Sequence, residues 1–202
     1  MRLRVNDGQS RGKGCNFEYH ITRQRLAGMA TMARFEILEN LSNLSLQGQT
    51  SLHAILASTD KLAGAFDIEV TEPGVFDLSA PMEGSLEIYV DDLRTESYLD
   101  VAVRDRLNTR RYPKIVASLT GMRPHEDEAG RFLATGDITF HGETCSQSSE
   151  ISVRWMDDDT IEVKGEIWID VREFKVELPK MITSSVEPDV RARLRLMLKR
   201  KV

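Results

Sequence analysis

From Ala33 onward, apolar and polar residues alternate with a period of two along most of the chain. Leu86, Ile88 and Val90 show this pattern, and so do residues 151–155 and 161–171. Successive side chains of a β-strand point to opposite faces, so this period indicates strands with one buried face. The run 161–171 is about twice the usual strand of five or six residues. Long strands of this kind are typical of a closed barrel or a strongly coiled sheet.

Turn chemistry separates the alternating runs at regular intervals. Residues 123–131, 141–144 and 156–160 are rich in Asp, Glu and Gly where the apolar pattern lapses. Consecutive strands that are joined by short turns form an antiparallel meander. The acidic residues at 125–128 and 157–159 fit hairpin tips and lack the spacing of a calcium loop.

The C-terminal run has the composition of a basic amphipathic helix, but its spacing favours a strand. Apolar residues occupy every second position from Val190 to Leu198, and a helix would scatter them around most of its circumference. We predict a closing strand whose outer face carries an arginine row, Arg191, Arg193 and Arg195. The simplest interpretation of this row is protection against edge-to-edge aggregation.

One segment has the period of a helix. Leu99, Val103 and Leu107 recur at intervals of four residues, and Pro113 marks a return to extended chain. We therefore predict one principal helix, at about residues 96–110, that crosses or plugs the barrel. The fold class expected is all-β, an antiparallel barrel with this helix and a poorly ordered N-terminal tail.

The totals fit one soluble domain with extra length at one end. The chain has 202 residues, a formal net charge of -5 and two cysteines, Cys15 and Cys145. These totals do not indicate nucleic acid as a partner or a disulfide framework. No apolar run reaches the roughly 18 residues of a membrane span, so we expect no integral membrane contact. Residues 1–31 show no regular spacing of apolar residues. We interpret them as a disordered tail, or as an annotation artefact upstream of a true translation start at Met29 or Met32. The barrel domain is expected at residues 32–202.

The N-terminus also lacks the apolar core of a secretory signal, and a cytoplasmic protein is expected. An Arg-rich organellar presequence is the rival interpretation, but the acidic residues Asp7 and Glu18 interrupt it.

Four segments, in order, resemble the YceI-like family. They are a strand-and-Gly segment at 51–66, a strand, helix and Tyr-Pro restart at 84–115, a "GDITFHGETCS" hairpin within 130–146, and a late "DVREF" strand end within 165–181. Together they cover about Ala33 to Leu198. The resemblance implies a lipocalin-like barrel that holds a polyisoprenoid or another long amphiphilic lipid in its interior.

His141 precedes Cys145 by four residues, a spacing that raises the question of a metal site or a Cys–His nucleophile. Ile138 and Phe140 share one face of the strand, so His141 falls on the other face, beside Gly142 at a turn. We expect His141 to be an exposed or turn-stabilising residue and Cys145 to be an ordinary strand residue. The sequence contains no phosphate loop and no nucleophile elbow, and we predict no catalytic residue, no metal and no cofactor.

The function expected is non-enzymatic binding, storage or transport of a long apolar or amphiphilic ligand, such as an isoprenoid or another lipid. Two alternatives stay open: a small-molecule enzyme that acts on a lipid or quinone, and a protein-interaction module that uses the arginine row. Residues on the apolar strand faces are the candidate lining of a binding cavity: Phe140, Val153, Trp155, Ile167 and Ile169.

Overall fold

The computed structural model describes residues 31–72, 75–95, 107–126, 128–177 and 186–201. Its strands are β1 (Thr31–Ile37), β2 (Asn43–Gln49), β3 (Ala54–Thr59), β4 (Ala63–Glu72), β5 (Val75–Phe76), β6 (Glu83–Tyr89), β7 (Arg94–Thr95), β8 (Lys114–Pro124), β9 (Arg131–Phe140), β10 (Glu143–Trp155), β11 (Thr160–Asp170) and β12 (Asp189–Arg200). Its 3-10 helices are η1 (Glu39–Leu41), η2 (Val90–Asp92) and η3 (Val171–Phe174).

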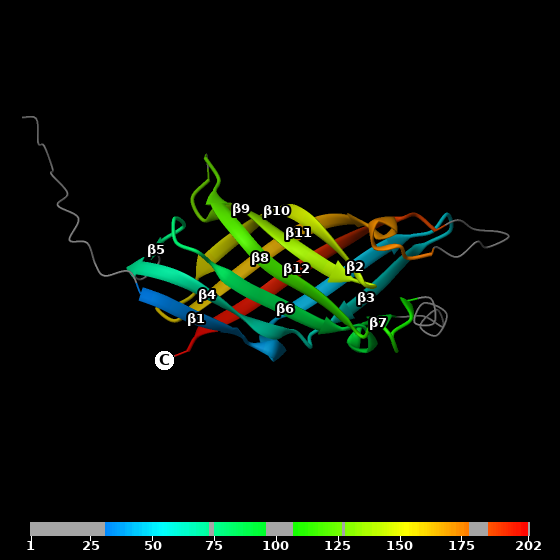
Figure 1. Cartoon of the computed structure of the whole chain (residues 1–202), viewed down its shortest axis with the longest axis horizontal. Coiled ribbons are helices and arrows are strands. Elements are labelled where there is room, and N and C mark those ends of the chain that lie inside the picture. Colours follow the sequence, from blue (N-terminus) through cyan, green and yellow to red (C-terminus); the bar gives the residue numbers. More distant parts are fainter. Residues whose placement is uncertain (1–30, 73–74, 96–106, 127, 178–185, 202) are drawn as a thin grey trace, which may run out of the picture.

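The strands form an antiparallel meander that closes on itself (Figure 1). From β4 the order is β4, β6, β8, β9, β10, β11 and β12, and β1 pairs with both β4 and β12. The described residues therefore form a closed eight-stranded barrel, which confirms the predicted fold class. The described residues of the acidic segments, 125–126 and 128 in one and 157–159 in the other, lie between β8 and β9 and between β10 and β11, at the predicted hairpin tips.

The first long strand of the barrel is broken between β1 and β2, and Ser42 bridges the break. Both strands pair with β12, with Ile37 opposite Leu198 and Leu44 opposite Leu194. The buried Ser42 hydroxyl donates to the Leu38 carbonyl at 2.8 Å and accepts from the Met197 N–H at 2.9 Å. The side chain thus replaces a missing ladder hydrogen bond. Beyond the break, β2, β3 and β7 extend the wall.

The predicted closing strand is confirmed. β12 pairs with β11 over all but its last residue, from Asp189 opposite Asp170 to Lys199 opposite Thr160. Its other side pairs with β2 and then β1, so β12 is not an edge strand. The interpretation of the arginine row as protection of a free edge is therefore wrong.

Two predictions fall mainly outside the described residues. The N-terminal tail is one, since only Thr31 of that segment is described. For the helix at 96–110, the description begins at Leu107, which is helical, is followed by a turn and packs against the core. Within the described residues, no helix has the length and apolar character to cross a membrane.

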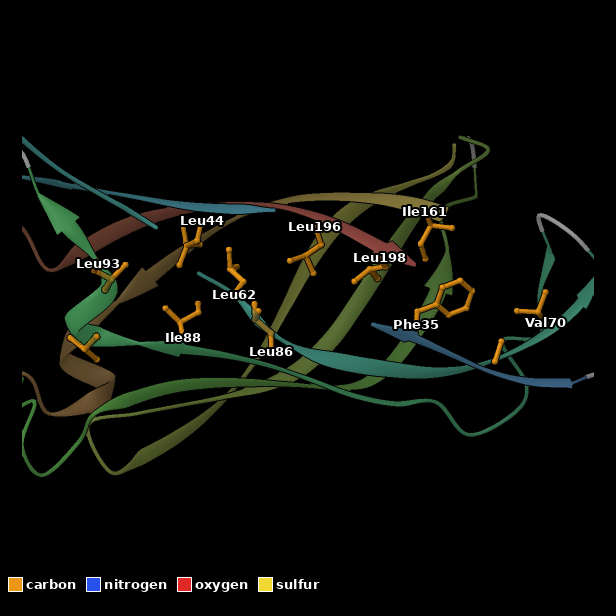
Figure 2. Close-up of a cluster of buried hydrophobic side chains, with 13 residues drawn as sticks. Phe35, Leu44, Leu62, Val70, Leu86, Ile88, Leu93, Ile161, Leu196 and Leu198 are labelled. Atoms are coloured by element: carbon orange, nitrogen blue, oxygen red, sulfur yellow. The ribbon is translucent and has the colours of Figure 1, made fainter. Parts of the chain in front are cut away.

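The tightly packed core lies against one side of the barrel. Buried apolar side chains come from β1, β2, β4, β6, β11 and β12 and the loops beside them, including Phe35, Leu86 and Leu196. Figure 2 shows this cluster as a row along the barrel, from Leu93 at one end to Val70 at the other. Leu86, Ile88 and Val90 belong to it, as their alternation predicts. The described part of β8, β9 and β10 contributes no fully buried residue.

Candidate functional site

The inward faces of β8, β9 and β10 border an internal cavity of about 210 Å³. Residues on this wall, such as Ala117, Ile138 and Ile151, alternate inward yet stay partly accessible. The opposite wall supplies Leu194, Leu196 and other leucines of the core. An eight-stranded barrel is wide enough either to be filled by side chains or to hold one small ligand. Here one wall is packed, and the other faces open space.

The structure places the five candidate lining residues in three positions. Val153 and Ile167 border the cavity directly. Trp155 lies beyond it, at the end of β10 among other aromatic rings. Phe140 and Ile169 pack partly buried against the core and are not among the residues that border the cavity.

An aromatic group lies at the end of the barrel where β10 finishes. The Trp155 ring is stacked on Phe76 at 5.3 Å between centroids and meets the edge of Phe35 at 6.0 Å. Phe76 also contacts Phe132 edge to face at 6.5 Å. Offset and edge-to-face contacts of this kind stabilise a cluster beyond the area that it buries. Phe76 also borders the cavity, so this group forms one apolar end of it.

The other end holds η3 and the hairpin of His141. His141 and Gly142 form the two-residue turn between β9 and β10, and both have positive φ, 52° and 86°. The His141 Nδ1 lies 3.1 Å from the Phe174 carbonyl oxygen, which can only accept, so this nitrogen carries the proton. Phe174 is 1% exposed, and its ring packs against that of Phe140 with 5.9 Å between the ring centroids. His141 thus stabilises the turn and holds η3 in place.

Cys145 lies beside this end as a strand residue. Its thiol donates a weak hydrogen bond to the Glu173 carbonyl at 3.7 Å, and burial raises the pKa of the thiol. A raised pKa disfavours the thiolate, which is the nucleophile and the metal ligand. No group of three or more His, Cys, Asp or Glu side chains converges within the described ranges.

The interior also carries two polar residues that the sequence analysis missed, Gln147 and Ser149 of β10. Both border the cavity, opposite Gly136 and Ala134 of β9, which have little or no side chain. The signal was present in the sequence: the alternation of Ile151 and Val153 continues backward through Ser149 and Gln147. Because these residues are polar, they resemble an outer face when the pattern is judged by hydrophobicity alone.

A family model for the YceI-like domain matches residues 35–198, from β1 to β12. The chain belongs to the YceI-like domain family. The resemblance noted in the sequence is therefore confirmed. None of the curated proteins compared with the chain matches it.

Solved structures share the YceI-like barrel at low sequence identity. BcnA of Burkholderia cenocepacia aligns with a TM-score of 0.67 and 16% identity, over 80% of this chain and 98% of BcnA. A polyisoprenoid binding domain from Saccharophagus degradans aligns with a TM-score of 0.63 and 15% identity, over 85% of this chain and all (100%) of that domain. The YceI protein of Campylobacter jejuni aligns with a TM-score of 0.55 and 13% identity, over 72% of this chain and 85% of the Campylobacter protein. At these identities the likeness shows the fold.

In this YceI-like barrel, three of the segments that carried the resemblance meet at η3. The Tyr112 ring packs against the His141 ring with 4.6 Å between the ring centroids. Tyr112 also covers Gly142, where a Cβ would lie 2.8 Å from a carbon of the tyrosine ring. Asp170 accepts from the Arg172 N–H at 2.9 Å at the start of η3, and its carboxylate also pairs with the Arg172 guanidinium. The Tyr-Pro, His-Gly and Asp-x-Arg-x-Phe motifs thus assemble the end of the barrel.

The arginine row of the YceI-like barrel is neutralised by carboxylates of its own chain. Arg191 and Arg193 both pair with Glu166, at 2.6 and 2.8 Å. Arg195 pairs at 2.8 Å with Glu162, whose side chain is only 5% exposed because Arg154 and Lys164 also cover it. Glu162 lay on the predicted outer face, where these three cations shield it from solvent.

We expect Glu162 to make the stability of the barrel depend on acid. The Arg195 hydrogen bond, with help from Lys164 and Arg154, holds the pKa of Glu162 at about 2. A carboxyl whose folded pKa lies below its unfolded pKa contributes stability above the unfolded value, and this contribution is lost as pH falls toward the folded value. Glu162→Gln should therefore lower the free energy of unfolding at pH 7 by about 1–2 kcal/mol and flatten its decline between about pH 5 and pH 2.

The matched control is Glu166→Gln, because the Glu166 side chain is 38% exposed and its ion pairs contribute little. Urea denaturation at a series of pH values measures both variants. A Glu162→Gln protein that keeps the full acid slope would contradict this assignment.

Proposed function

We propose that the barrel binds a long apolar or amphiphilic molecule in its interior and releases it unchanged. The observation that carries the proposal is the asymmetry of the interior. A packed wall faces the partly accessible inward faces of β8, β9 and β10 across a cavity of about 210 Å³. Cavities that bind small molecules are mostly apolar with a few polar groups, which is the composition of this lining.

The size and shape of the cavity favour one chain. Val153 and Gln147, which both border the cavity, are six residues apart on β10, roughly 20 Å at the rise of a strand. The volume is below the roughly 300–1,000 Å³ of pockets for drug-sized ligands. A narrow, elongated space suits a single extended hydrocarbon chain, and the ligand class we propose is an isoprenoid or another lipid. The name of the Saccharophagus degradans domain, a polyisoprenoid binding domain, supports this class.

The chemistry of the polar groups supports binding without catalysis. His141 uses its Nδ1 to hold the Phe174 carbonyl, and burial opposes ionisation of the Cys145 thiol. A nucleophile needs an adjacent base that is oriented by a third group. These two residues show no such relation, and each has a structural role.

Val153→Trp tests whether the cavity binds a ligand. Ile167 borders the same cavity and is a further proposed contact, and Phe140, Trp155 and Ile169 are proposed as contacts of a ligand chain that extends beyond the cavity. The indole would occupy much of the space that Val153 borders, so we expect the affinity for the neutral fluorophore N-phenylnaphthylamine to fall at least about tenfold. The melting temperature should stay nearly unchanged, because the new ring fills open space. Fluorescence titration and calorimetry measure the two properties.

Ser152→Trp is the matched control, because Ser152 is the exposed neighbour on the outer face of β10. It should leave fluorophore binding intact. If the interior were packed, Val153→Trp would instead cost about 1–3 kcal/mol of stability, and neither protein would bind the fluorophore. Native mass spectrometry of the purified protein identifies any lipid that copurifies.

A further inference from the structure

We infer that Gln147 and Ser149 form a subsite inside the barrel that accepts a hydrogen bond from the ligand, so that the barrel selects lipids with a hydroxyl group over lipids with an anionic head. This inference rests on the proposed function and specifies the class of ligand. It starts from the two polar side chains that interrupt the apolar lining.

The hydroxyl hydrogen of Ser149 is already in a hydrogen bond within the barrel. Its hydroxyl donates to the Glu166 carbonyl at 2.8 Å, a bond across to the neighbouring strand β11. A serine hydroxyl carries one hydrogen and two lone pairs. With the hydrogen engaged, the Ser149 oxygen remains an acceptor where it borders the cavity.

The neighbouring Gln147 is held in one orientation by Glu173 of η3. Its Nε2 donates to the Glu173 carboxylate at 3.1 Å, and a carboxylate can only accept, so the nitrogen rather than the oxygen faces η3. Among the residues that the structure describes, none donates to the Gln147 amide oxygen. This second acceptor is two residues from Ser149 on the same inward face of β10.

The β9 wall leaves space beside this pair. Gly136 and Ala134 lie opposite Gln147 and Ser149 in the register, so β9 places no large side chain over the two acceptors. A Cβ on Gly136 would lie 2.4 Å from the Ser118 carbonyl oxygen, so the backbone arrangement itself demands glycine there. From the β9 side, the polar group of a ligand therefore has access to both oxygens.

The charges that the described residues place around the cavity disfavour an anionic head. No Lys, Arg or His is found among the described residues that border it, and the one ionisable residue is Asp137, whose carboxylate accepts from Ser146. At the η3 end, Arg172 is paired with Asp170 at 2.6 Å and Lys175 with Glu143 at 2.7 Å. Among these described residues, a carboxylate or phosphate would lose its hydration and would meet two acceptors and no unpaired cation.

The arrangement also orients the ligand. The acceptors lie toward η3, and Phe76, Trp155 and Phe132 form the apolar group beyond the other end. An amphiphile would place its hydroxyl at Gln147 and Ser149 and extend its chain toward the aromatic group.

Three probes of one chain length test the subsite: dodecanol, its methyl ether and dodecanoate, each titrated against bound N-phenylnaphthylamine on the full chain. The ether keeps the oxygen but has no hydrogen to donate. We expect dodecanol to bind about tenfold more tightly than either of the other two, the factor that one well-formed hydrogen bond supplies. In the Gln147→Met, Ser149→Ala double variant, the affinity for dodecanol should fall to the affinity for the ether.

Ser148→Ala is the matched control, since Ser148 lies between the two residues on the outer face and bonds Thr135 there. This variant should bind dodecanol more tightly than the ether and dodecanoate, as the unmodified protein is expected to do. Unchanged fluorophore affinity in the double variant verifies that the cavity is intact. Equal binding of dodecanol and ether to the unmodified protein, or a preference that survives in the double variant, would overturn the subsite alone. Failure of the fluorophore and all three probes to bind would overturn the proposed function itself.

Discussion

Leu194→Pro is expected to prevent the barrel from folding. Leu194 lies in the middle of β12, opposite Gly165 of β11 on one side and Leu44 of β2 on the other. Proline removes a ladder N–H, and its ring does not fit inside a strand that is paired on both sides. Because β12 also closes the barrel against β1, the damage cannot stay local. The expected loss is about 3 kcal/mol or more, a large part of the stability of a typical domain.

Leu194→Ala separates the backbone effect from the loss of the side chain. It keeps the N–H and removes only apolar contacts of a partly buried residue, so the protein should fold with a lower melting temperature. Circular dichroism and size-exclusion chromatography of the two variants make the comparison. A folded, monodisperse Leu194→Pro protein would show that β12 is peripheral to the barrel.

The period of two was sufficient to predict the barrel, because each strand has one face toward the interior. It located β11 to within a residue and distinguished β12 from a basic helix. It did not reveal that the first long strand is broken, since the break depends on the Ser42 hydroxyl meeting the Met197 N–H, 155 residues away in sequence. Contacts of that range leave no local pattern.

The candidate site was predictable in part for a related reason. Alternation shows which way Val153, Ile167 and Phe140 point, but the distance to the opposite wall depends on the curvature of the whole barrel. Val153 and Ile167 face the open space, whereas Phe140 contacts Phe174 of η3. The polar pair Gln147 and Ser149 was missed because the inward face was identified by its hydrophobicity, and a ligand site with acceptors breaks that rule.

The second large effect is expected at Gly64, in the strand-and-Gly segment that contributed to the resemblance. Gly64 is the second residue of β4. Its φ of 147° is a conformation that residues with a Cβ rarely adopt. Gly64 also lies directly against β6, where a Cβ would sit 1.9 Å from the Ser85 carbonyl oxygen. Neither strand can move aside without breaking the pairing of Gly64 with Leu86.

Gly64→Ala should therefore lower the free energy of unfolding by about 3 kcal/mol or more, since backbone strain and a clash with backbone atoms add together. Gly121→Ala is the matched control within a strand: its φ is not positive, and a Cβ there would meet no atom within 4 Å. That change should stay within about 0.5 kcal/mol of the unmodified protein. The midpoint of urea denaturation measures both. Equal midpoints for the two variants would mean that β4 and β6 are not held as closely as the pairing of Gly64 with Leu86 requires.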